Sequence, residues 1–161
     1  MNIGLFSDTH GLLRPEAVAA LEGCDVLIHA GDVGDRETLE ELHAMGCRHV
    51  VRGNVDHGAW ASGADGLPLR LELELGALRV VVVHDRAELE PPDELAARGV
   101  GLAVFGHSHR PAVERHADLW LVNPGSCGPR RFRLPVTVAR AELDAASGKW
   151  IRAPEIVELE V

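Results

Sequence analysis

Short apolar runs alternate with polar, turn-forming stretches along this chain, and the pattern predicts buried strands separated by helices. Five runs rich in Val, Ile, Leu and Phe are bounded by Gly and other turn residues, as buried strands are. They are Asn2–Phe6, Val26–Ile28, Val50–Val51, Val80–Val83 and Leu102–Phe105. Apolar residues at helical spacing, preceded by a proline or capping residue and followed by a glycine, predict helices between them. These helices are expected between Pro15 and Gly23, from Asp35 through Met45 and from Pro92 to Arg98.

The early order of strand, helix, strand, helix, strand predicts a parallel sheet with crossover helices. Later segments favour paired strands instead. Leu69–Leu75 alternates Leu and Glu, which is typical of a strand with one exposed face, and Gly76–Ala77 then turns it into Leu78–Val83 as a hairpin. Further strands are expected at Leu119–Val122, Pro135–Leu143 and Ile156–Val161, the last of them at a sheet edge. A turn is expected at Ala145–Lys149 and a mobile surface loop at Gly58–Gly66. Together these elements predict two packed sheets flanked by helices.

Composition narrows the class of protein. The 161 residues predict one domain spanning 1–161, and a hydrophobic content of 46% is typical of an ordered globular chain. A formal net charge of −9 argues against nucleic acid as a stable partner. Scattered cysteines without a CxxC pair predict reduced core thiols. They are Cys24, Cys47 and Cys127.

The same features set expectations for location. The first strand leads to candidate site residues as early as Asp8, so no signal peptide is expected. No apolar run approaches the roughly 20 residues that span a bilayer. We therefore expect a cytoplasmic protein with no membrane partner, and the sequence leaves the oligomeric state open.

Each of the five apolar runs ends on residues suited to binding a divalent metal ion. The segments are Ser7–Gly11 (SDTHG), His29–Asp32 (HAGD), Gly53–Asp56 (GNVD), His84 after four valines, and Gly106–His109 (GHSH). Ligands of open α/β sheets collect beyond the carboxyl ends of the strands, so one site built from all five segments is expected. The candidate ligands are Asp8, His10, Asp32, Asn54, His84, His107 and His109. Nitrogen and oxygen ligands of this kind suit Mn, Fe, Zn, Ni or Co.

Each segment also has a purely structural interpretation. Asp8 and Asp32 are equally typical of helix caps, Asn54 of a turn, and His84 of a hydrogen-bonded strand end. The two GHSH histidines would face opposite ways in a continuing strand, whereas a glycine-led turn lets them straddle two ions. What favours a metal site is that all five segments carry such residues at once.

Taken in order, the segments resemble the calcineurin-like metallophosphoesterase superfamily, and in particular its small bacterial and archaeal phosphodiesterase branch. The family blocks D-x-H, G-D, G-N-x-D/H, a lone H and G-H-x-H correspond to SDTHG, AGDVG, GNVD, VVHD and GHSH, and NPGS (Asn123–Ser126) is a further shared feature. The resemblance runs from Ile3 to about Arg130. It implies an α/β fold of four layers, an α-β-β-α sandwich with two mixed β-sheets.

The resemblance also implies a centre of two divalent metal ions, with Mn²⁺ as the first choice and Fe, Zn, Ni or Co as others. One ion would be held by Asp8, His10, Asp32 and His109, and the other by Asp32, Asn54, His84 and His107. Asp32 would bridge them, which suits a carboxylate with two oxygens, although the sequence alone also allows Asp8. Only these two ligands are anionic, so the loaded site keeps positive charge and suits a small phosphate-ester substrate.

The expected function is therefore a dinuclear metal-dependent phosphoesterase in which a metal-bridging hydroxide attacks the ester. Asp32, Asn54 and His84 are the residues expected to serve catalysis. The alternative is a non-catalytic protein-binding scaffold of the same fold, like the retromer subunit of this superfamily. Loss of a metal ligand would indicate a scaffold, and none of the seven is lost.

Two positions depart from the family pattern. Asp85 follows His84 where many members have glycine, and it can crowd the pocket or pair with Arg86. Val55 stands where many monoesterases of the superfamily have histidine, which predicts a preference for phosphodiesters over monoesters because acid–base help is missing.

Other polar residues have supporting or surface roles in this interpretation. His29 is expected either in the core or orienting a ligand, with the orienting role favoured, and Asp56 either holds the Asn54 turn or accepts a proton from a ligand histidine. The histidines expected on the surface or in loops are His43, His49, His57 and His116.

Overall fold

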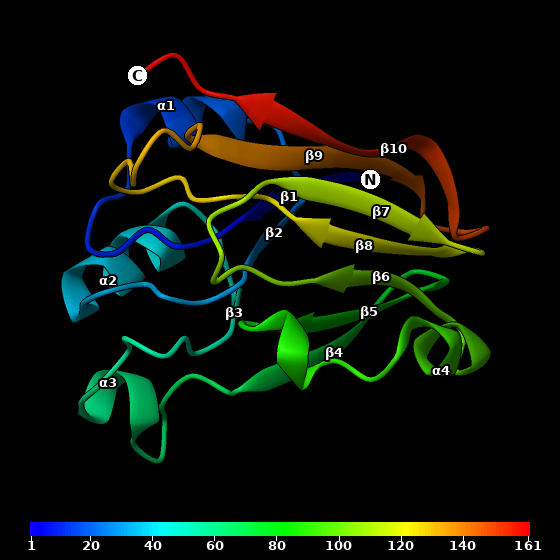
Figure 1. Ribbon diagram of the computed structural model, residues 1–161, viewed down its shortest axis with the longest axis horizontal. Helices are drawn as coiled ribbons and strands as arrows, with labels where there is room; N and C mark the ends of the chain where they lie inside the picture. The colour runs from blue at the N-terminus through cyan, green and yellow to red at the C-terminus, as the bar shows by residue number, and fades with distance from the viewer.

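The computed structural model describes residues 1–161 as two five-stranded mixed sheets (Figure 1). The first sheet has the order β10-β9-β1-β2-β3, with β1, β2 and β3 parallel and β9 and β10 antiparallel to their neighbours. Its strands are β1 (Asn2–Phe6), β2 (Val26–His29), β3 (His49–Val50), β9 (Thr137–Asp144) and β10 (Lys149–Glu158).

The second sheet has the order β4-β5-β6-β8-β7. Its central strands β5, β6 and β8 are parallel, while β4 and β7 pair antiparallel at the two edges. Its strands are β4 (Arg70–Leu75), β5 (Leu78–Val83), β6 (Val100–Val104), β7 (Ala112–His116) and β8 (Leu119–Asn123). The β4–β5 hairpin turns at Gly76–Ala77, as the alternating pattern predicts.

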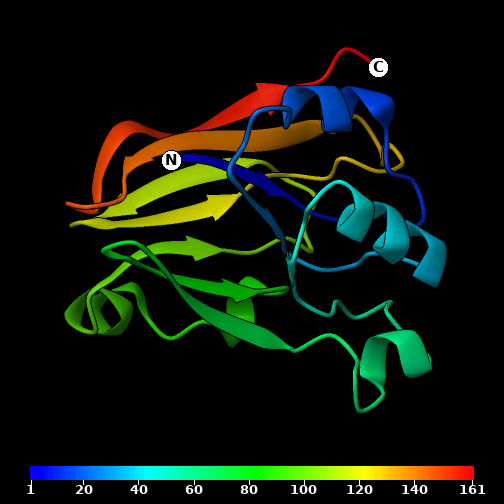
Figure 2. The same cartoon turned by 180° about the vertical axis from the view of Figure 1, so that it is seen from behind.

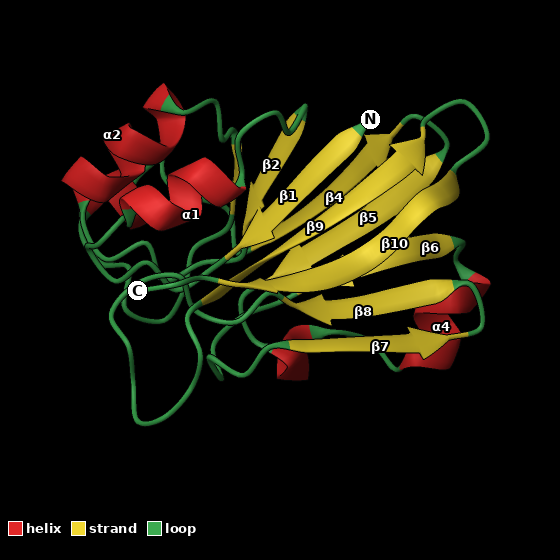
Figure 3. Cartoon of the chain, turned by 90° about the horizontal axis from the view of Figure 1, so that it is seen from above, coloured by secondary structure: helices red, strands yellow, loops and turns green.

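Helices cover the outer faces of both sheets. The helices are α1 (Pro15–Ala20), α2 (Arg36–Ala44), α3 (Ala59–Ser62), the 3₁₀ turn η1 (Arg86–Glu88) and α4 (Pro92–Ala97). Figure 3 shows α1 and α2 together near one end of the strands and α4 near the other. None of these helices is long and apolar enough to cross a membrane.

Three apolar clusters define the layers. The first lies between the sheets and joins Ile3 of β1 with Val80 of β5. The second packs Phe6 against Leu42 of α2, and the third packs Val81 against Leu95 of α4. The layer order is therefore α-β-β-α, and the predicted sandwich of two mixed sheets is confirmed.

Strand β5 contains four consecutive valines, Val80–Val83, because both of its faces are covered. Val80 and Val82 face the other sheet, while Val81 and Val83 face the α4 side, and all four are buried. A strand covered on both faces has no position for a polar side chain. Burying each valine contributes roughly 1.5–3 kcal/mol.

Helix α2 follows the predicted boundaries closely. Asp35 precedes it, and its Oδ1 accepts a hydrogen bond of 2.8 Å from the Thr38 N–H. Met45 ends it, and Gly46 follows with φ +92°, a conformation that glycine adopts without strain. The three cysteines are free, and two of them, Cys47 and Cys127, are buried, as expected for core thiols.

Three local expectations need correction. Strand β7 was not predicted, because its residues alternate poorly and none is buried. Strand β10 begins at Lys149 rather than Ile156, since an edge strand tolerates charged residues, Pro154 and register shifts. Residues 58–66 are not simply a loop: α3 forms there, with Ala61 buried and the Ser62 hydroxyl donating to the Gly58 carbonyl.

The fold brings the candidate segments to one end of the molecule. In Figure 1, β6 and β8 point toward the side where α2 and the loops after β1 and β2 lie, and Figure 2 shows the same gathering from behind. Hydrogen bonds join these loops directly, because Asp8 N donates to Gly31 O and His107 N donates to Asp8 Oδ2. Five stretches distant in sequence thus meet at one end of the sandwich.

Candidate metal centre

The backbone at the candidate ligands is held in an uncommon conformation. Seven non-glycine residues have positive φ, and five of them are candidate ligands, with φ between 46° and 69°. They are Asp8, His10, Asp32, His107 and His109. Such residues cost of order 1–3 kcal/mol each and cluster at functional sites. The strain is concentrated where the side chains must converge.

The first cluster contains Asp8, His10 and His109. The two histidine Nε2 atoms lie 3.1 Å apart, and Asp8 Oδ1 lies 3.3 Å from His109 Nε2 and 3.7 Å from His10 Nε2. Asp8 Oδ1 is buried and has no hydrogen-bond partner. A buried carboxylate oxygen without a partner is costly, so a cation among these three atoms fits the cluster.

The second cluster contains Asp32, His84 and His107, and Asn54 lies between them. His84 Nε2 is 3.1 Å from Asp32 Oδ2 and 3.0 Å from Asn54 Oδ1, and His107 Nδ1 is 3.0 Å from the same Asn54 oxygen. The other ring nitrogen of His84 donates to the Ala30 carbonyl at 2.7 Å. Metal-ligating histidines are usually oriented by such an outer hydrogen bond. The donor set therefore fits a second cation.

Asp32 faces both clusters. Its Oδ2 lies 3.6 Å from His10 Nε2 in the first cluster and 3.1 Å from His84 Nε2 in the second. Its Oδ1 accepts a hydrogen bond from the Val55 N–H at 3.0 Å, which fixes the carboxylate. This position fits the bridging role, with one carboxylate between two ion sites.

The two clusters shift the pKa values of their own members. Burial lowers the pKa of His84, but hydrogen bonds to Asp32 and Ala30 and the charge of Asp8 outweigh it and raise the pKa to about 9. Burial raises the pKa of Asp8, but the nearby imidazoles of His10 and His109 outweigh it and hold the pKa well below its usual range. Without bound ions the site would keep its carboxylates ionised and hold a proton on His84, where an ion would bind.

Metal binding is consequently expected to be proton-linked. An ion must displace the His84 proton, so affinity for Mn²⁺ should fall as pH decreases below about 9, by up to about tenfold per pH unit. Calorimetry in two buffers of different ionisation enthalpy at pH 7.5 should detect proton release on binding. An affinity that is constant between pH 6 and 8.5 would contradict this assignment of His84.

Two glycines are required for the close approach of the loops. A Cβ at Gly53 would lie 2.0 Å from Asp32 Oδ1, and one at Gly106 would lie 2.6 Å from Asp8 Oδ2. Any side chain at these positions would displace a candidate ligand. Gly53 and Gly106 are therefore needed for the Asp32 and Asp8 carboxylates to keep their positions.

Asp56 joins two of the ligand loops. Its buried carboxylate accepts hydrogen bonds from the N–H groups of Val33 at 3.2 Å, Gly34 at 2.9 Å and Gly53 at 2.8 Å. Of the two roles expected from the sequence, it therefore has the one that holds the Asn54 turn, and it also secures the loop after Asp32.

Replacing Asp56 with alanine should lower the free energy of unfolding by about 3 kcal/mol, because three N–H groups lose a charged partner. The matched control is Asp35→Ala, which removes one helix cap and should cost about 1 kcal/mol. Urea denaturation of both variants provides the comparison. Equal losses in the two variants would show that Asp56 does not hold these loops.

His29 supports the loops rather than a ligand side chain, which corrects the favoured expectation. Its Nδ1 accepts from the Gly31 N–H at 3.2 Å, so Nε2 carries the proton toward Thr9 Oγ1 at 3.1 Å. Burial lowers the pKa of His29 to about 3 and keeps the ring neutral. The ring thus links the loop after β1, through Thr9, to the loop after β2, through Gly31.

The NPGS segment supports the site from the other side. Asn123 Nδ2 donates to Gly106 O at 2.9 Å and to Ser108 Oγ at 3.0 Å, and the Ser126 hydroxyl donates to Asp8 O at 2.9 Å. These bonds fix the GHSH turn and the loop of Asp8. In the sequence, only the NPGS family motif indicates that Asn123 and Ser126 support the site.

A cavity of about 480 Å³ opens beside the second cluster. Asn54, His84 and His107 line it together with Arg52, His57, Asp85 and Glu88. Asp85 therefore faces this cavity, and its Oδ2 lies 3.8 Å from His107 Nε2. His43, His49 and His116 lie outside both clusters, but they belong to α2, β3 and β7 and are half-buried rather than in surface loops, whereas His57 is exposed as expected.

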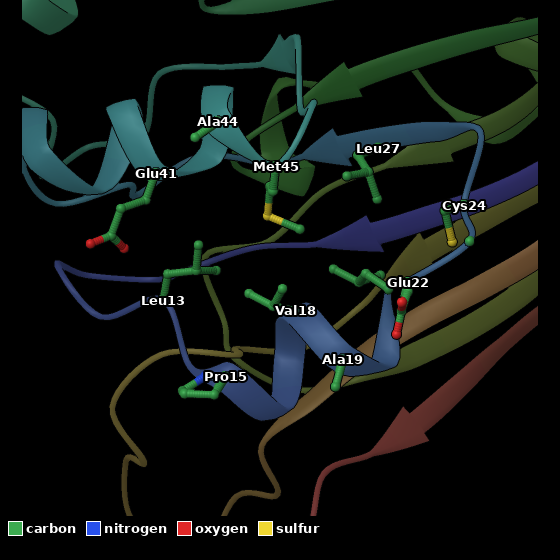
Figure 4. Close-up of a pocket in the computed structure, with 12 residues that line it drawn as sticks. Leu13, Pro15, Val18, Ala19, Glu22, Cys24, Leu27, Glu41, Ala44 and Met45 are labelled. Atoms are coloured by element: carbon green, nitrogen blue, oxygen red, sulfur yellow. The ribbon is translucent and has the colours of Figure 1, made fainter.

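A larger cavity, of about 910 Å³, contains none of the candidate ligands. It is an apolar groove between α1 and α2, lined by residues such as Val18, Leu27 and Met45 (Figure 4). Most of its lining is apolar, and its acidic residues, Glu22 and Glu41, are accompanied by no histidine, so it resembles an apolar groove more than a catalytic pocket.

The sandwich and the paired clusters define a metal-binding α/β protein of the phosphoesterase class. The family model of the calcineurin-like phosphoesterase superfamily domain matches residues 1–146, and the chain belongs to this superfamily. A probable metallophosphoesterase of Methanocaldococcus jannaschii is 34% identical over 137 residues, covering 78% of this chain and 68% of that protein. The family resemblance drawn from the motifs is confirmed.

Two solved structures share the fold. A novel archaeal phosphodiesterase, 21% identical, has a TM-score of 0.71 over 98% of this chain and 100% of its own. Vps29 of Chaetomium thermophilum, 20% identical, has a TM-score of 0.73 over 98% of this chain and 97% of its own. At these identities the likeness shows the common fold alone.

Proposed function

We propose that this protein is a dinuclear metal-dependent phosphoesterase that favours phosphodiesters over monoesters. The observation that carries the proposal is the position of Asp32, whose carboxylate lies within 3.6 Å of histidines from both clusters. One ion would be held by Asp8, His10, Asp32 and His109, and the other by Asp32, Asn54, His84 and His107. Manganese is the first choice, and Fe, Zn, Ni or Co suit the same donors.

The chain's own residues would position an anionic ester. Two divalent ions bound in these clusters would acidify a water molecule and stabilise charge on the phosphoryl oxygens. Arg52 and His57 line the cavity beside Asn54 and would contact a phosphate placed there. In the overall reaction, water adds to phosphorus, one P–O ester bond breaks and the departing oxygen gains a proton. A diester thus yields a monoester and an alcohol.

The preference for diesters follows from Val55. This residue adjoins the centre, because its N–H donates to Asp32 Oδ1, but its side chain can neither donate a proton nor carry charge. Without that help, substrates with good leaving groups and one negative charge should react best.

Wild-type protein should therefore hydrolyse bis(p-nitrophenyl) phosphate well above p-nitrophenyl phosphate. Val55→His should raise the monoester rate, within the roughly 10²–10⁴-fold range of acid–base catalysis. Val55→Leu is the matched control and should leave the ratio of the two rates unchanged. A wild-type enzyme already faster on the monoester would show that Val55 does not set the preference.

A non-catalytic scaffold is the second candidate function, favoured by the fold shared with Vps29 and by the apolar groove between α1 and α2. The complete set of seven side chains argues for the enzyme. A protein that binds two ions tightly yet hydrolyses neither test ester would support the scaffold.

A further inference from the structure

Arginines without an ion-pair partner gather around the metal centre. Seven of the fifteen arginines lie within 4.0 Å of a carboxylate. Of the eight others, five lie on the segments that surround the first cluster, in a chain of net charge −9. These five are Arg14, Arg110, Arg130, Arg131 and Arg133. Several guanidinium groups without a carboxylate partner thus lie on segments next to the first cluster.

The segment carrying three of them, residues 130–133, which we name the Arg-Phe loop, leaves directly from the metal centre. Just before it, Ser126 Oγ donates to Asp8 O at 2.9 Å and Cys127 N donates to Ser7 O at 3.1 Å. Arg14 Nε then donates to Gly128 O at 2.9 Å. In Figure 1 this yellow-to-orange segment between β8 and β9 lies at the same end as the loops after β1 and β2.

Phe132, at the centre of the loop, is the most exposed large apolar residue of the protein. The residue is 93% exposed, and Arg130, Arg131 and Arg133 beside it are exposed as well. The loop therefore presents an open aromatic face among three free guanidinium groups. Nucleobases stack on such faces, and guanidinium groups bind phosphates in a bidentate manner.

We propose that the Arg-Phe loop binds a short single-stranded oligonucleotide as the substrate of the metal centre, an inference that rests on the proposed function. Arg130, Arg131 and Arg133 would each hold a phosphate near the scissile diester, and Phe132 would stack a base. Three arginines give a transient substrate complex rather than a stable one, which agrees with the acidic composition.

Binding can be measured separately from hydrolysis. Fluorescence anisotropy of a labelled oligothymidine of about twelve nucleotides, in EDTA and 50 mM salt, reports the loop without turnover. Wild-type protein should bind, and three phosphate contacts predict about a 20-fold loss of affinity between 50 and 200 mM salt. Arg131→Ala/Arg133→Ala should bind at least about tenfold more weakly and lose only about threefold over the same salt range.

Matched controls separate the loop from general charge and folding. Arg115→Ala/Arg152→Ala removes two exposed arginines from β7 and β10 and should bind like wild type. Phe132→Trp should keep affinity, whereas Phe132→Leu should lose about fivefold or more. Melting temperatures verify that every variant is folded.

Several results would overturn the proposal. They are an absence of oligonucleotide binding by wild type, equal losses in the two double variants, or binding to phosphatidylserine vesicles but not to the oligonucleotide. Hydrolysis of bis(p-nitrophenyl) phosphate by wild type is assayed in parallel. Hydrolysis without oligonucleotide binding contradicts the loop proposal alone, and oligonucleotide binding without hydrolysis contradicts the proposed function alone.

Discussion

Asp32→Asn should yield folded protein that retains at most one tightly bound ion and hydrolyses bis(p-nitrophenyl) phosphate at least about 100-fold more slowly. The amide can still accept the Val55 N–H bond through one oxygen, so the loop keeps its position. It loses the charge and the second oxygen that lie between the two clusters. Losing an outer-shell partner already costs about 10–100-fold, and a bridging ligand should cost more.

The matched control for this variant is Asp118→Asn, at a fully exposed turn between β7 and β8. It should keep both ions and wild-type turnover. Metal content by mass spectrometry and initial rates on the same samples decide the comparison. A folded Asp32→Asn protein with two ions and near-wild-type turnover would refute the dinuclear assignment.

His107→Ala and His109→Ala should each remove one ion but not the same one. His107 belongs with Asp32 and His84, whereas His109 belongs with Asp8 and His10. The metal content should fall from two ions toward one in each variant, and turnover should fall by at least about 100-fold. His109→Ala should also lower stability, because Asp8 Oδ1 remains buried without its neighbour.

His43→Ala, on the last turn of α2 and outside both clusters, is the control for histidine loss. Circular dichroism confirms folding, and competition with a fluorescent chelator gives the affinity of the remaining ion. Full metal content in both His107→Ala and His109→Ala would show that the GHSH turn does not bind metal and has only a structural role.

Most of the fold could be predicted from the sequence because its strongest patterns involve residues that are neighbours along the chain. The four valines of β5 and the Asp35 cap of α2 each act through neighbouring residues, so the pattern predicts the element. Part of the site could be predicted for a related reason, since the carboxyl ends of parallel strands within one sheet lie together. The candidate ligands follow strands of both sheets, and only the family motifs combined the two groups. A proposed set of seven residues from five loops follows from that rule and from the family motifs.

The remaining features depend on tertiary contacts that no local pattern encodes. Strand β7 forms because its backbone pairs with β8, although its own side chains are half-buried or exposed. The roles of His29 and Asp56 depend on backbone N–H groups of other loops, which a sequence does not place. The strained φ angles of five candidate ligands are likewise visible only in three dimensions.

The central claim is that this chain holds two divalent ions and uses them to cleave phosphate esters. Its most direct test is metal analysis of purified wild-type protein, coupled to a screen of generic phosphodiesters and monoesters before and after chelation. We expect two ions per chain, diester hydrolysis that is lost on chelation, and recovery on adding Mn²⁺. One ion or none at saturating Mn²⁺, or hydrolysis that survives complete metal removal, would contradict the account.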